Sequence, residues 1–289
     1  MKQRCISCDS QRLRTYDAMV APFLAQRIWN VPQKEAHLLS CKDCGMTFFV
    51  PRLTDEEVGL LYHDYRGEEY QRARQTAEPG YTPECNASLQ GSEEALNIRK
   101  TTMASFLKKH MALDKVRSVL DYGGDRGQFI CDELGGAERY VYDISGVEPI
   151  AGVNRFVEGA RTDYDLMMCV QVLEHISYPK EMLAKIKRIG NEGTMFYFEV
   201  PWEFPLRTPA AGMKGKMEQL VISSPFLYNA YRRMTGDKFR MHEHINYFDE
   251  RSLQNLLANS GFKVVALERV KLKGSGMDTT VISCLARTA

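Results

Sequence analysis

Apolar blocks separated by polar turns run through the second half of the chain, and their lengths are those of strands and helices. Short apolar runs rich in β-branched and aromatic residues predict buried parallel strands at 116–120, 139–143 and 164–173. A helix is expected over 179–190, opened by a proline and closed by a glycine, and a further strand ends at Pro201. Strands and helices in alternation indicate an α/β sheet.

The flanking segments carry similar signals. Thr54 and Glu57 form a capping box, which predicts a helix from Asp55, and a longer helix is expected over 92–110. Towards the end of the chain we expect three more elements: a helix after Asp249 and strands at 262–270 and 279–287.

The turn after the first strand has the residues that a nucleotide-type cofactor requires. Strand 116–120 runs into DYGGDRGQF, where Gly123 and Gly127 let the main chain adopt left-handed angles and approach a ligand closely. A helix expected to start near Gln128 would offer its free N–H groups at the same place. A turn that only packs helix on strand would have the same glycines, so this motif alone leaves both interpretations open.

The ends of the next two strands support the interpretation that this turn binds a nucleotide-type cofactor. Asp143 follows the second strand, 22 positions after Asp121, which is the spacing at which a doubly wound sheet places a carboxylate beside a ribose. An aspartate that caps the next turn is the alternative. Glu174 and His175 leave the third strand at its C-terminal end, where ligands bind in open α/β sheets.

Together these segments resemble the core of class I S-adenosylmethionine-dependent methyltransferases. DYGGDRGQF, YDIS and DYDLMMCVQVLEHI follow in the family's order, although Asp125 stands where its DxGxGxG pattern has the middle glycine. The resemblance implies a Rossmann-like, seven-stranded α/β sheet that is completed by an antiparallel pair at 262–270 and 279–287. It also implies S-adenosyl-L-methionine as cofactor, bound by Asp121, Gly123, Gly124, Gly127, Asp143, Ile144 and Gln171.

Two CxxC pairs near the N-terminus indicate a small, zinc-ribbon-like module over residues 1–50. Four thiolates in two pairs suit tetrahedral zinc, and a fold of about fifty residues has too little core to be secure without such a site. A redox pair or disulfides are the alternatives. The N-terminus has no apolar signal segment, so we expect a cytoplasmic protein, in which disulfides are rare. The expected ligands of a structural zinc ion are Cys5, Cys8, Cys41 and Cys44.

Residues 51–100 are polar and rich in tyrosine, and we expect them to form a helical linker or lid before a methyltransferase domain at 101–289. Tyrosines at helical spacing usually pack with one polar end in water, and they also suit the mouth of an active site. We expect Tyr65 and Tyr70 to contact a substrate.

The stretch 202–248 is far longer than a plain connection, so we expect it to form a substrate cap. Residues 202–241 include seven basic and three acidic residues, whereas the whole chain has a net charge of only +1. An anionic, nucleotide-linked substrate would explain this local excess, and a solvated surface would explain it equally well. The basic residues are Arg207, Lys214, Lys216, Arg232, Arg233, Lys238 and Arg240.

The insertion ends in MHEHINYF, which with His175 and the CxxC pairs resembles the zinc-containing deoxysugar C-methyltransferases of antibiotic pathways. Carried over residue by residue, the resemblance implies His244 as general base, Glu243 as its neighbouring acid and His175 as an assisting histidine. That family has a tyrosine at the position of Met241 and a further C-terminal domain that the resemblance does not cover, which leaves C-, O- and N-methylation open. Histidines hydrogen-bonded at a helix start, or binding a metal with Glu243, are alternatives.

Three functional classes fit these observations. The first is a small-molecule methyltransferase acting on a nucleotide-linked sugar or a related polysaccharide or natural-product precursor. The second is a ribosomal or transfer RNA methyltransferase, which is disfavoured because 38 basic residues nearly balance 37 acidic ones. The third is a non-catalytic protein that binds the cofactor. No uncharged run approaches the length of a membrane span, so we expect no membrane partner.

Overall fold

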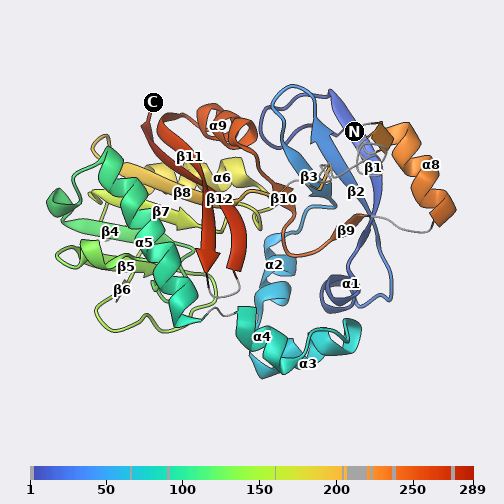
Figure 1. Ribbon diagram of the computed structural model, residues 1–289, viewed down its shortest axis with the longest axis horizontal. Coiled ribbons are helices and arrows are strands. Elements are labelled where there is room, and N and C mark those ends of the chain that lie inside the picture. Colours follow the sequence, from blue (N-terminus) through green and yellow to red (C-terminus); the bar gives the residue numbers. More distant parts are fainter. Residues whose placement is uncertain are drawn as a thin grey trace.

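The computed structural model describes residues 3–65, 67–89, 92–159, 161–203, 205–206, 220–221, 224–235, 239–274 and 277–289. Within them the chain forms a seven-stranded sheet and a five-stranded sheet. Figure 1 shows the larger sheet beside the smaller one, which is built mainly from the N-terminal segment.

The seven-stranded sheet has the order β11-β12-β8-β7-β4-β5-β6, which confirms the expected Rossmann-like α/β fold class. β4 pairs in parallel with both β5 and β7, so the chain leaves β4 on one side and later returns on the other. The carboxyl ends of β4 and β7 therefore meet at a topological switch point, where open α/β sheets bind ligands. Its strands are β4 (Ser118–Tyr122), β5 (Glu138–Tyr142), β6 (Asn154–Arg155), β7 (Leu166–Val170), β8 (Met195–Pro201), β11 (Phe262–Gly274) and β12 (Met277–Thr288).

The last two strands form the expected antiparallel pair, and β12 also pairs antiparallel with β8. The four helices expected to start near Asp55, Ser92, Pro179 and Glu250 are also present. The side chains of Thr54, Ser92 and Asp249 each accept a backbone N–H from the first turn of their helix. These helices are α2 (Asp55–Tyr62), α5 (Glu93–His110), α6 (Pro179–Ile189) and α9 (Glu250–Asn259).

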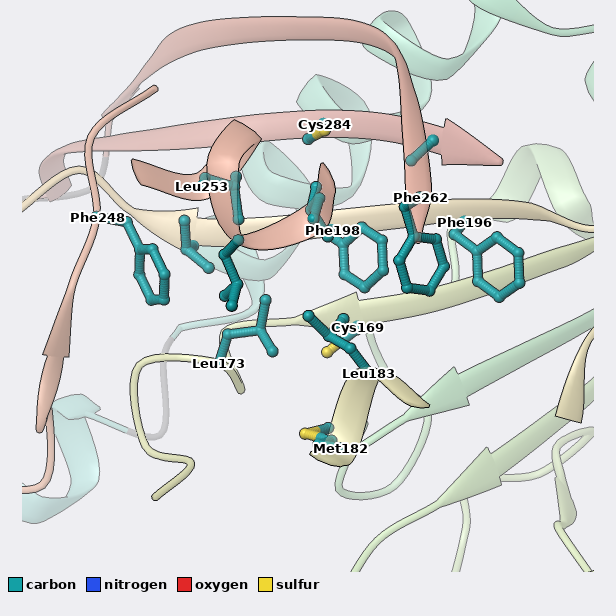
Figure 2. Packing of buried hydrophobic residues seen from close by; sticks show 14 of the residues in the cluster. Cys169, Leu173, Met182, Leu183, Phe196, Phe198, Phe248, Leu253, Phe262 and Cys284 are labelled. Carbon is teal, nitrogen blue, oxygen red and sulfur yellow. The ribbon is translucent and has the colours of Figure 1, made fainter. Parts of the chain in front are cut away.

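Alternate residues of β8 face opposite sides of the larger sheet, as the pleat of a strand requires. Tyr197 packs in the cluster that contains residues of α5, whereas Phe196 and Phe198 pack with residues of α6 and α9. Figure 2 shows this second cluster, in which Phe262 of β11 lies edge-on to Phe196 and Phe198, with ring centroids 5.0 and 5.5 Å apart. Each such buried ring contributes about 1.5–3 kcal/mol.

One expected helix is absent from the described residues, because no α-helix begins near Gln128. Turns and a short 3₁₀ helix, Asp132–Leu134, take its place. The Gln128 side chain accepts the N–H of Arg126 at 3.0 Å and donates to Asp125 Oδ2 at 3.1 Å. Local bonds of this kind compete with helical hydrogen bonds. The expectation that helix N–H groups face a cofactor at this turn is therefore wrong.

The five-stranded sheet has the order β10-β3-β2-β1-β9. The first three strands in the chain are antiparallel neighbours, and the two short strands from the end of the expected cap close its two edges. Residues 1–50 therefore share a sheet with residues 239–247. Its strands are β1 (Leu13–Val20), β2 (Glu35–Cys41), β3 (Thr47–Val50), β9 (Phe239–Met241) and β10 (Asn246–Tyr247), and the remaining helices are α1 (Pro22–Trp29), α3 (Glu68–Ala77), α4 (Pro83–Leu89) and α8 (Pro225–Thr235).

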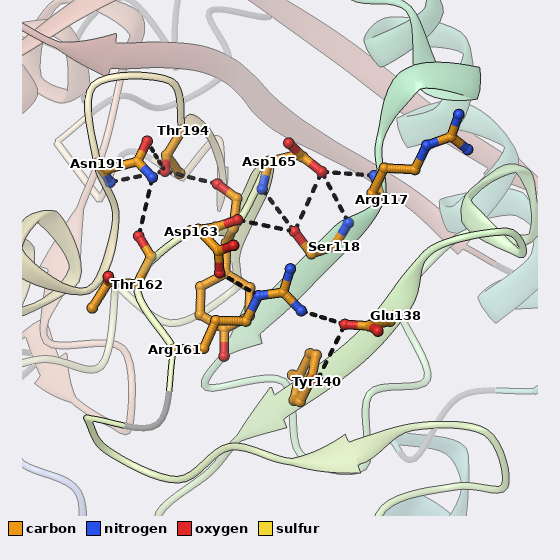
Figure 3. A network of polar contacts seen from close by, with 11 residues as sticks. Arg117, Ser118, Glu138, Tyr140, Arg161, Thr162, Asp163, Asp165, Asn191 and Thr194 are labelled. Carbon is orange, nitrogen blue, oxygen red and sulfur yellow. Dashed lines mark hydrogen bonds and ion pairs between the residues drawn. The ribbon is translucent and has the colours of Figure 1, made fainter.

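A polar network joins the amino-terminal ends of the central strands (Figure 3). Asp165 Oδ2 accepts the backbone N–H groups of Arg117 and Ser118 at 2.7 and 3.0 Å. Arg161 forms ion pairs with Glu138 and with an aspartate of its own loop. These bonds fix the strand ends opposite the switch point and leave the carboxyl ends for a ligand.

Candidate functional site

The turn after β4 contains several residues in left-handed backbone conformations. Gly123 and Gly127 have φ angles of +82° and +79°, and a Cβ atom on Gly123 would lie 2.7 Å from Val172 Cγ2. Asp125 also has a positive φ, 54°, which aspartate tolerates better than most residues. Asp125 thus takes the left-handed conformation for which glycine is the usual residue. A Cβ atom on Gly124 would lie 2.2 Å from the Asp121 carboxylate, so this position also requires glycine.

Carboxylates gather beneath and beside this turn. Asp121 is fully buried, and neither of its oxygens has a hydrogen-bond partner within the described part of the chain. Burial, followed by the charges of Asp143 and Asp125, raises the pKa of Asp121 to about 8. Asp143 accepts the N–H groups of Asp125 and Ser145 at 2.9 and 2.8 Å, which is the turn-capping role considered as an alternative. Each oxygen of Asp143 retains a lone pair for a ligand hydroxyl.

The other expected cofactor residues follow the ends of neighbouring strands. Ile144 comes next to Asp143 after β5 and is 64% exposed. Gln171 comes directly after β7 with a φ of 57°, and its Nε2 donates to Glu199 Oε1 at 3.3 Å. The structure thus places these residues at the carboxyl ends of β4, β5 and β7. A negatively charged, partly open site of this kind attracts a cationic ligand.

Two histidines face each other beside the end of β7. His175 and His244 have ring centroids 4.7 Å apart at an interplanar angle of 74°. His244 lies between β9 and β10, in a segment that we call the histidine loop (residues 242–245). The N-terminal sheet holds both ends of this loop, because β9 pairs with β1 and β10 pairs with β3.

The carboxylate that meets the His244 ring is that of Glu203, with Oε2 2.8 Å from Nδ1. A carboxylate accepts, so Nδ1 carries the proton and Nε2 keeps its lone pair. Burial lowers the pKa of His244, but the hydrogen bond to Glu203 and the charge of Glu174 outweigh it and raise the pKa above its usual value. The Glu243 carboxylate binds the Tyr70 hydroxyl and the Arg74 guanidinium instead.

His175 is held in a different environment. Its Nδ1 lies 3.0 Å from the Glu243 carbonyl oxygen and 3.0 Å from the Tyr62 hydroxyl. Burial, followed by the charge of His244, lowers the pKa of His175 to about 4. His175 is therefore neutral near pH 7.

The tyrosines of the linker pack into this region. Tyr65 is half-buried and lies edge-on to both Tyr62 and Tyr70, with centroids 5.1 and 5.3 Å apart. Tyr70 is fully buried, and its hydroxyl binds Glu243. The contact of Tyr65 and Tyr70 with a substrate stays a prediction.

Arg52 joins three segments of the site with its guanidinium. It donates to the carbonyl oxygens of Phe49 and Ile245, which belong to the N-terminal sheet and the histidine loop, at 2.8 and 3.2 Å. It also donates to the carbonyl oxygens of Ile176 and Ser177, which follow His175, at 2.9 and 3.0 Å. Burial lowers the pKa of Arg52 to about 9. This one side chain therefore ties the two histidine segments to the N-terminal module.

A model of a methyltransferase domain matches residues 96–267, which is more than half of the chain. The chain belongs to this methyltransferase family. The matched segment begins in α5, ends in β11 and includes the turn after β4 and both facing histidines. The expected enzyme class, a methyltransferase, is thereby confirmed.

Several solved structures are similar to this methyltransferase at low sequence identity. The mitomycin 7-O-methyltransferase is 13% identical, with a TM-score of 0.42, over 75% of this chain and 60% of its own. This chain therefore spans less than two thirds of that protein. A Burkholderia thailandensis 1,6-didemethyltoxoflavin N1-methyltransferase, solved with its substrate and S-adenosylhomocysteine, is 16% identical over 86% of this chain and 97% of its own, with a TM-score of 0.49.

The Synechocystis magnesium protoporphyrin IX methyltransferase is 12% identical, with a TM-score of 0.41, over 66% of this chain and 84% of its own. At these low sequence identities, the similarity of the structures does not identify the methyl acceptor of this chain. No curated protein sequence matches the methyltransferase.

The two CxxC pairs of the methyltransferase come together at the end of β2. The four Sγ atoms lie within 4.8 Å of one another, with Cys5 and Cys44 3.5 Å apart and Cys8 and Cys41 3.6 Å apart. None of them forms a disulfide. Zinc–sulfur bonds of about 2.3 Å at tetrahedral angles separate the sulfurs by about 3.8 Å. The cluster therefore has the size and the donor atoms that a zinc ion requires.

A second group with metal-binding side chains has a different size. Ligand atoms of Glu174, His175 and His244 also lie within 4.8 Å of one another, with Glu174 Oε1 4.0 Å from His175 Nε2. Tetrahedral zinc with nitrogen and oxygen ligands would separate them by about 3.4 Å. This group is wider than such a site, so we assign no metal to it.

The expected cap is described in part. Arg207, Lys214, Lys216 and Lys238 lie outside the described residues, and so does the side chain of Arg232. Arg233 Nε lies 3.6 Å from Asp17 Oδ2, and Arg240 is exposed on β9. The convergence of the basic residues on a phosphate stays a prediction. Among the described helices, none is both long and apolar enough to cross a membrane.

Proposed function

We propose that the enzyme transfers the methyl group of S-adenosyl-L-methionine to a small-molecule acceptor, most specifically a nucleotide-linked sugar, and that His244 accepts the acceptor's proton. The pairing of His244 with Glu203, opposite His175 and beside the switch point of the sheet, is the observation that carries this proposal. It combines a candidate proton acceptor with a candidate cofactor site in one part of the molecule.

The residues after β4 and β5 fit the cofactor. When bound, S-adenosylmethionine supplies an electrophilic methyl group on a positively charged sulfur. Asp121 has a buried carboxylate without a partner among the described residues, and Asp143 has lone pairs for ribose hydroxyls. The negative charge of this region favours a cationic cofactor over a neutral one.

His244 has the arrangement of a general base. Its Nδ1–H donates to Glu203, so Nε2 can take the proton of an acceptor hydroxyl as the methyl–oxygen bond forms. Glu203 fixes the ring and stabilises the imidazolium, and general bases of this kind contribute about 10²–10⁴-fold to rate. Because His175 is neutral, it can donate or accept a hydrogen bond, and it does not compete with His244 for the acceptor's proton.

The nucleotide-linked class of acceptor is supported by the charge of the insertion. The excess of basic residues over 202–241 is local, in a chain whose net charge is +1. Arginine and lysine near a substrate site bind phosphate groups through charge-assisted hydrogen bonds. Phosphate recognition at this position would hold a sugar near His244.

We also propose that Cys5, Cys8, Cys41 and Cys44 bind one structural zinc ion. Cys5, Cys41 and Cys44 are buried in the same cluster as Phe248, which follows β10, and Leu253 of α9. A zinc ion there would stabilise the sheet that holds the histidine loop, rather than taking part in the chemistry.

The test uses methyl-labelled S-adenosylmethionine and three groups of acceptors: nucleoside diphosphate sugars, the matching free sugars, and unmodified RNA. We expect label in at least one nucleoside diphosphate sugar and much less in its free sugar. Label transferred to RNA alone would contradict the proposed acceptor. Failure to bind S-adenosylhomocysteine in calorimetry would contradict the cofactor assignment as well.

A further inference from the structure

Glu174 is a buried carboxylate whose side chain has no assigned task. It is 0% exposed, and neither of its carboxylate oxygens has a hydrogen-bond partner in the described residues. Its backbone oxygen accepts the N–H groups of Ile245 and Asn246 at 2.8 and 3.0 Å. The histidine loop and β10 therefore fix the backbone of Glu174, but they provide no hydrogen bond to its carboxylate.

An unpartnered carboxylate in the interior is strongly unfavourable when ionised. It is tolerated where it is protonated or where a cation forms beside it. The titratable groups that face Glu174 in the described structure are His175, His244, Glu203, Glu199, Tyr62 and Cys169. Of these, the two imidazoles are the groups that can become positive near neutral pH.

The two imidazoles differ in how readily they become positive. His175 is held neutral by burial, which lowers its pKa to about 4. His244 has a carboxylate on Nδ1, and a protonated ring is favoured there. A ligand atom of His244 lies within 4.8 Å of a carboxylate oxygen of Glu174. His244 is therefore the cation that Glu174 is placed to stabilise.

We propose that Glu174 is a positioning residue, the buried countercharge that stabilises the imidazolium formed on His244 during methyl transfer. In this step the acceptor oxygen bonds to the methyl carbon, the carbon–sulfur bond breaks with its electron pair going to sulfur, and the hydroxyl proton moves to His244 Nε2. The imidazolium later releases this proton to water. The catalytic part of this inference rests on the proposed function, whereas the coupling between Glu174 and His244 does not require an acceptor.

The free enzyme has features that suit this role. Burial raises the pKa of Glu174 to about 7, and the charge of His244 opposes that rise. The charge of Glu174 raises the pKa of His244 and the charge of His244 lowers that of Glu174, so each group favours the charged form of the other. Replacement of Glu174 by a neutral amide would make His244 a weaker base.

The direct test is to measure the pKa of His244 by nitrogen-15 NMR of labelled histidines. The sample is the zinc-loaded protein with bound S-adenosylhomocysteine. We expect Glu174→Gln to lower the pKa of His244 by about one unit. His110, which pairs with Glu268 elsewhere, serves as an internal control and should not move. The matched variant is Glu138→Gln, which makes the same change at the opposite end of the sheet, where Glu138 pairs with Arg161, and should leave His244 unchanged. An unchanged pKa of His244 in Glu174→Gln would overturn the inference.

A second measurement tests the coupling in the wild-type protein, so it does not depend on whether the Glu174→Gln variant folds. In the wild-type protein, carbon-13 NMR of labelled glutamate side chains should show a Glu174 carboxyl that titrates near neutral pH together with His244. A Glu174 carboxyl that titrates like a free glutamate, independently of His244, would equally contradict the coupling.

Kinetics separate this inference from the proposed function. With an acceptor from the screen, Glu174→Gln should lower kcat at least tenfold, leave KM for the cofactor unchanged and move the acidic limb of the pH profile to lower pH. A His244→Ala variant with normal turnover would overturn the base assignment even if the NMR coupling is present. Loss of turnover in His244→Ala, without coupling to Glu174, would overturn this inference alone.

Discussion

Several residues of the site have backbone angles or buried charges that are rare for their residue types. Asp125 and Gln171 have positive φ angles, and Asp121 and Glu174 are buried carboxylates without described partners. Such states cost free energy, so they persist where the surrounding structure imposes them and often mark functional sites. They cluster at the carboxyl ends of β4 and β7, where the two histidines lie and where we propose that the cofactor binds.

The first prediction concerns Asp143. Asp143→Ala removes the acceptor of two turn N–H groups and the proposed ribose ligand. We expect the Kd for S-adenosylhomocysteine, measured by calorimetry, to rise at least tenfold, or about 1.4 kcal/mol. Asp163→Ala, at the opposite end of the sheet, should leave the Kd unchanged. A normal Kd for Asp143→Ala would remove this residue from the ribose site.

The second prediction follows from the pKa of Asp121, which is about 8 in the folded protein and 3.8 for an unperturbed aspartate. Between these values the folded state holds a proton that the unfolded state has released. The free energy of unfolding of the cofactor-free enzyme therefore falls as pH rises through this window. Asp121→Asn should flatten this dependence and make the protein more stable at pH 8, by at least about 1 kcal/mol in urea unfolding. Identical pH profiles for the two proteins would show that the carboxyl is not buried without a partner.

At the scale of elements, local signals predicted well what they determine. Caps and apolar spacing gave α2, α5, α6 and α9, and short apolar runs gave the central strands, because these features depend on neighbours in sequence. β9 and β10 have three and two residues and pair with strands about two hundred positions away. No local periodicity marks strands that short.

The same limit explains the site residues that sequence reasoning missed. Glu203 is one of the three acidic residues of the insertion, and its pairing with His244 depends on how the chain returns to the site. Arg52 and Tyr62 meet the histidine segments only because the N-terminal module packs there. No spacing pattern carries such long-range contacts. The two pairs of cysteines and the facing histidines could be proposed because their residue types restrict the chemistry.

The third prediction concerns Arg52, which connects the N-terminal sheet with both histidine segments. Lysine cannot reproduce its fork of donors to several carbonyl oxygens. We expect Arg52→Lys to lower the free energy of unfolding by about 2–4 kcal/mol. The exposed pair of Arg12 with Asp43 provides the control, since Arg12→Lys should change stability by less than about 0.5 kcal/mol. Equal stabilities of the two variants would show that Arg52 does not hold these segments together.

At the scale of the whole molecule, the N-terminal module is part of the enzyme's core. The same buried cluster contains Cys41, Phe48, Phe248 and Leu253. Asn255 of α9 donates to the Cys44 carbonyl oxygen at 3.1 Å. The module therefore supports α9 and the histidine loop at the same time, and we expect its loss to affect stability and catalysis together.

The fourth prediction is the effect of zinc removal. If the four cysteines bind structural zinc as we propose, atomic absorption should find one zinc ion per chain, and Tm should fall after chelation or in Cys8→Ser, because a structural metal stabilises the folded state. Cys85→Ser, which lies outside the cluster, should retain the metal and nearly the wild-type Tm. A chelated protein with unchanged Tm would contradict a structural role for the site.

We propose that a histidine held by the N-terminal sheet accepts the proton in a methyl transfer at the switch point of the larger sheet. The most direct measurement is the single-turnover rate of His244→Ala with saturating S-adenosylmethionine and an acceptor from the screen, beside its affinity for S-adenosylhomocysteine. His242→Ala, a more exposed neighbour 3.8 Å from Glu78, is the matched control. We predict a rate at least ~10²-fold lower for His244→Ala alone, with unchanged cofactor affinity. A His244→Ala rate within a few-fold of wild type would show that the proton leaves the acceptor by another route.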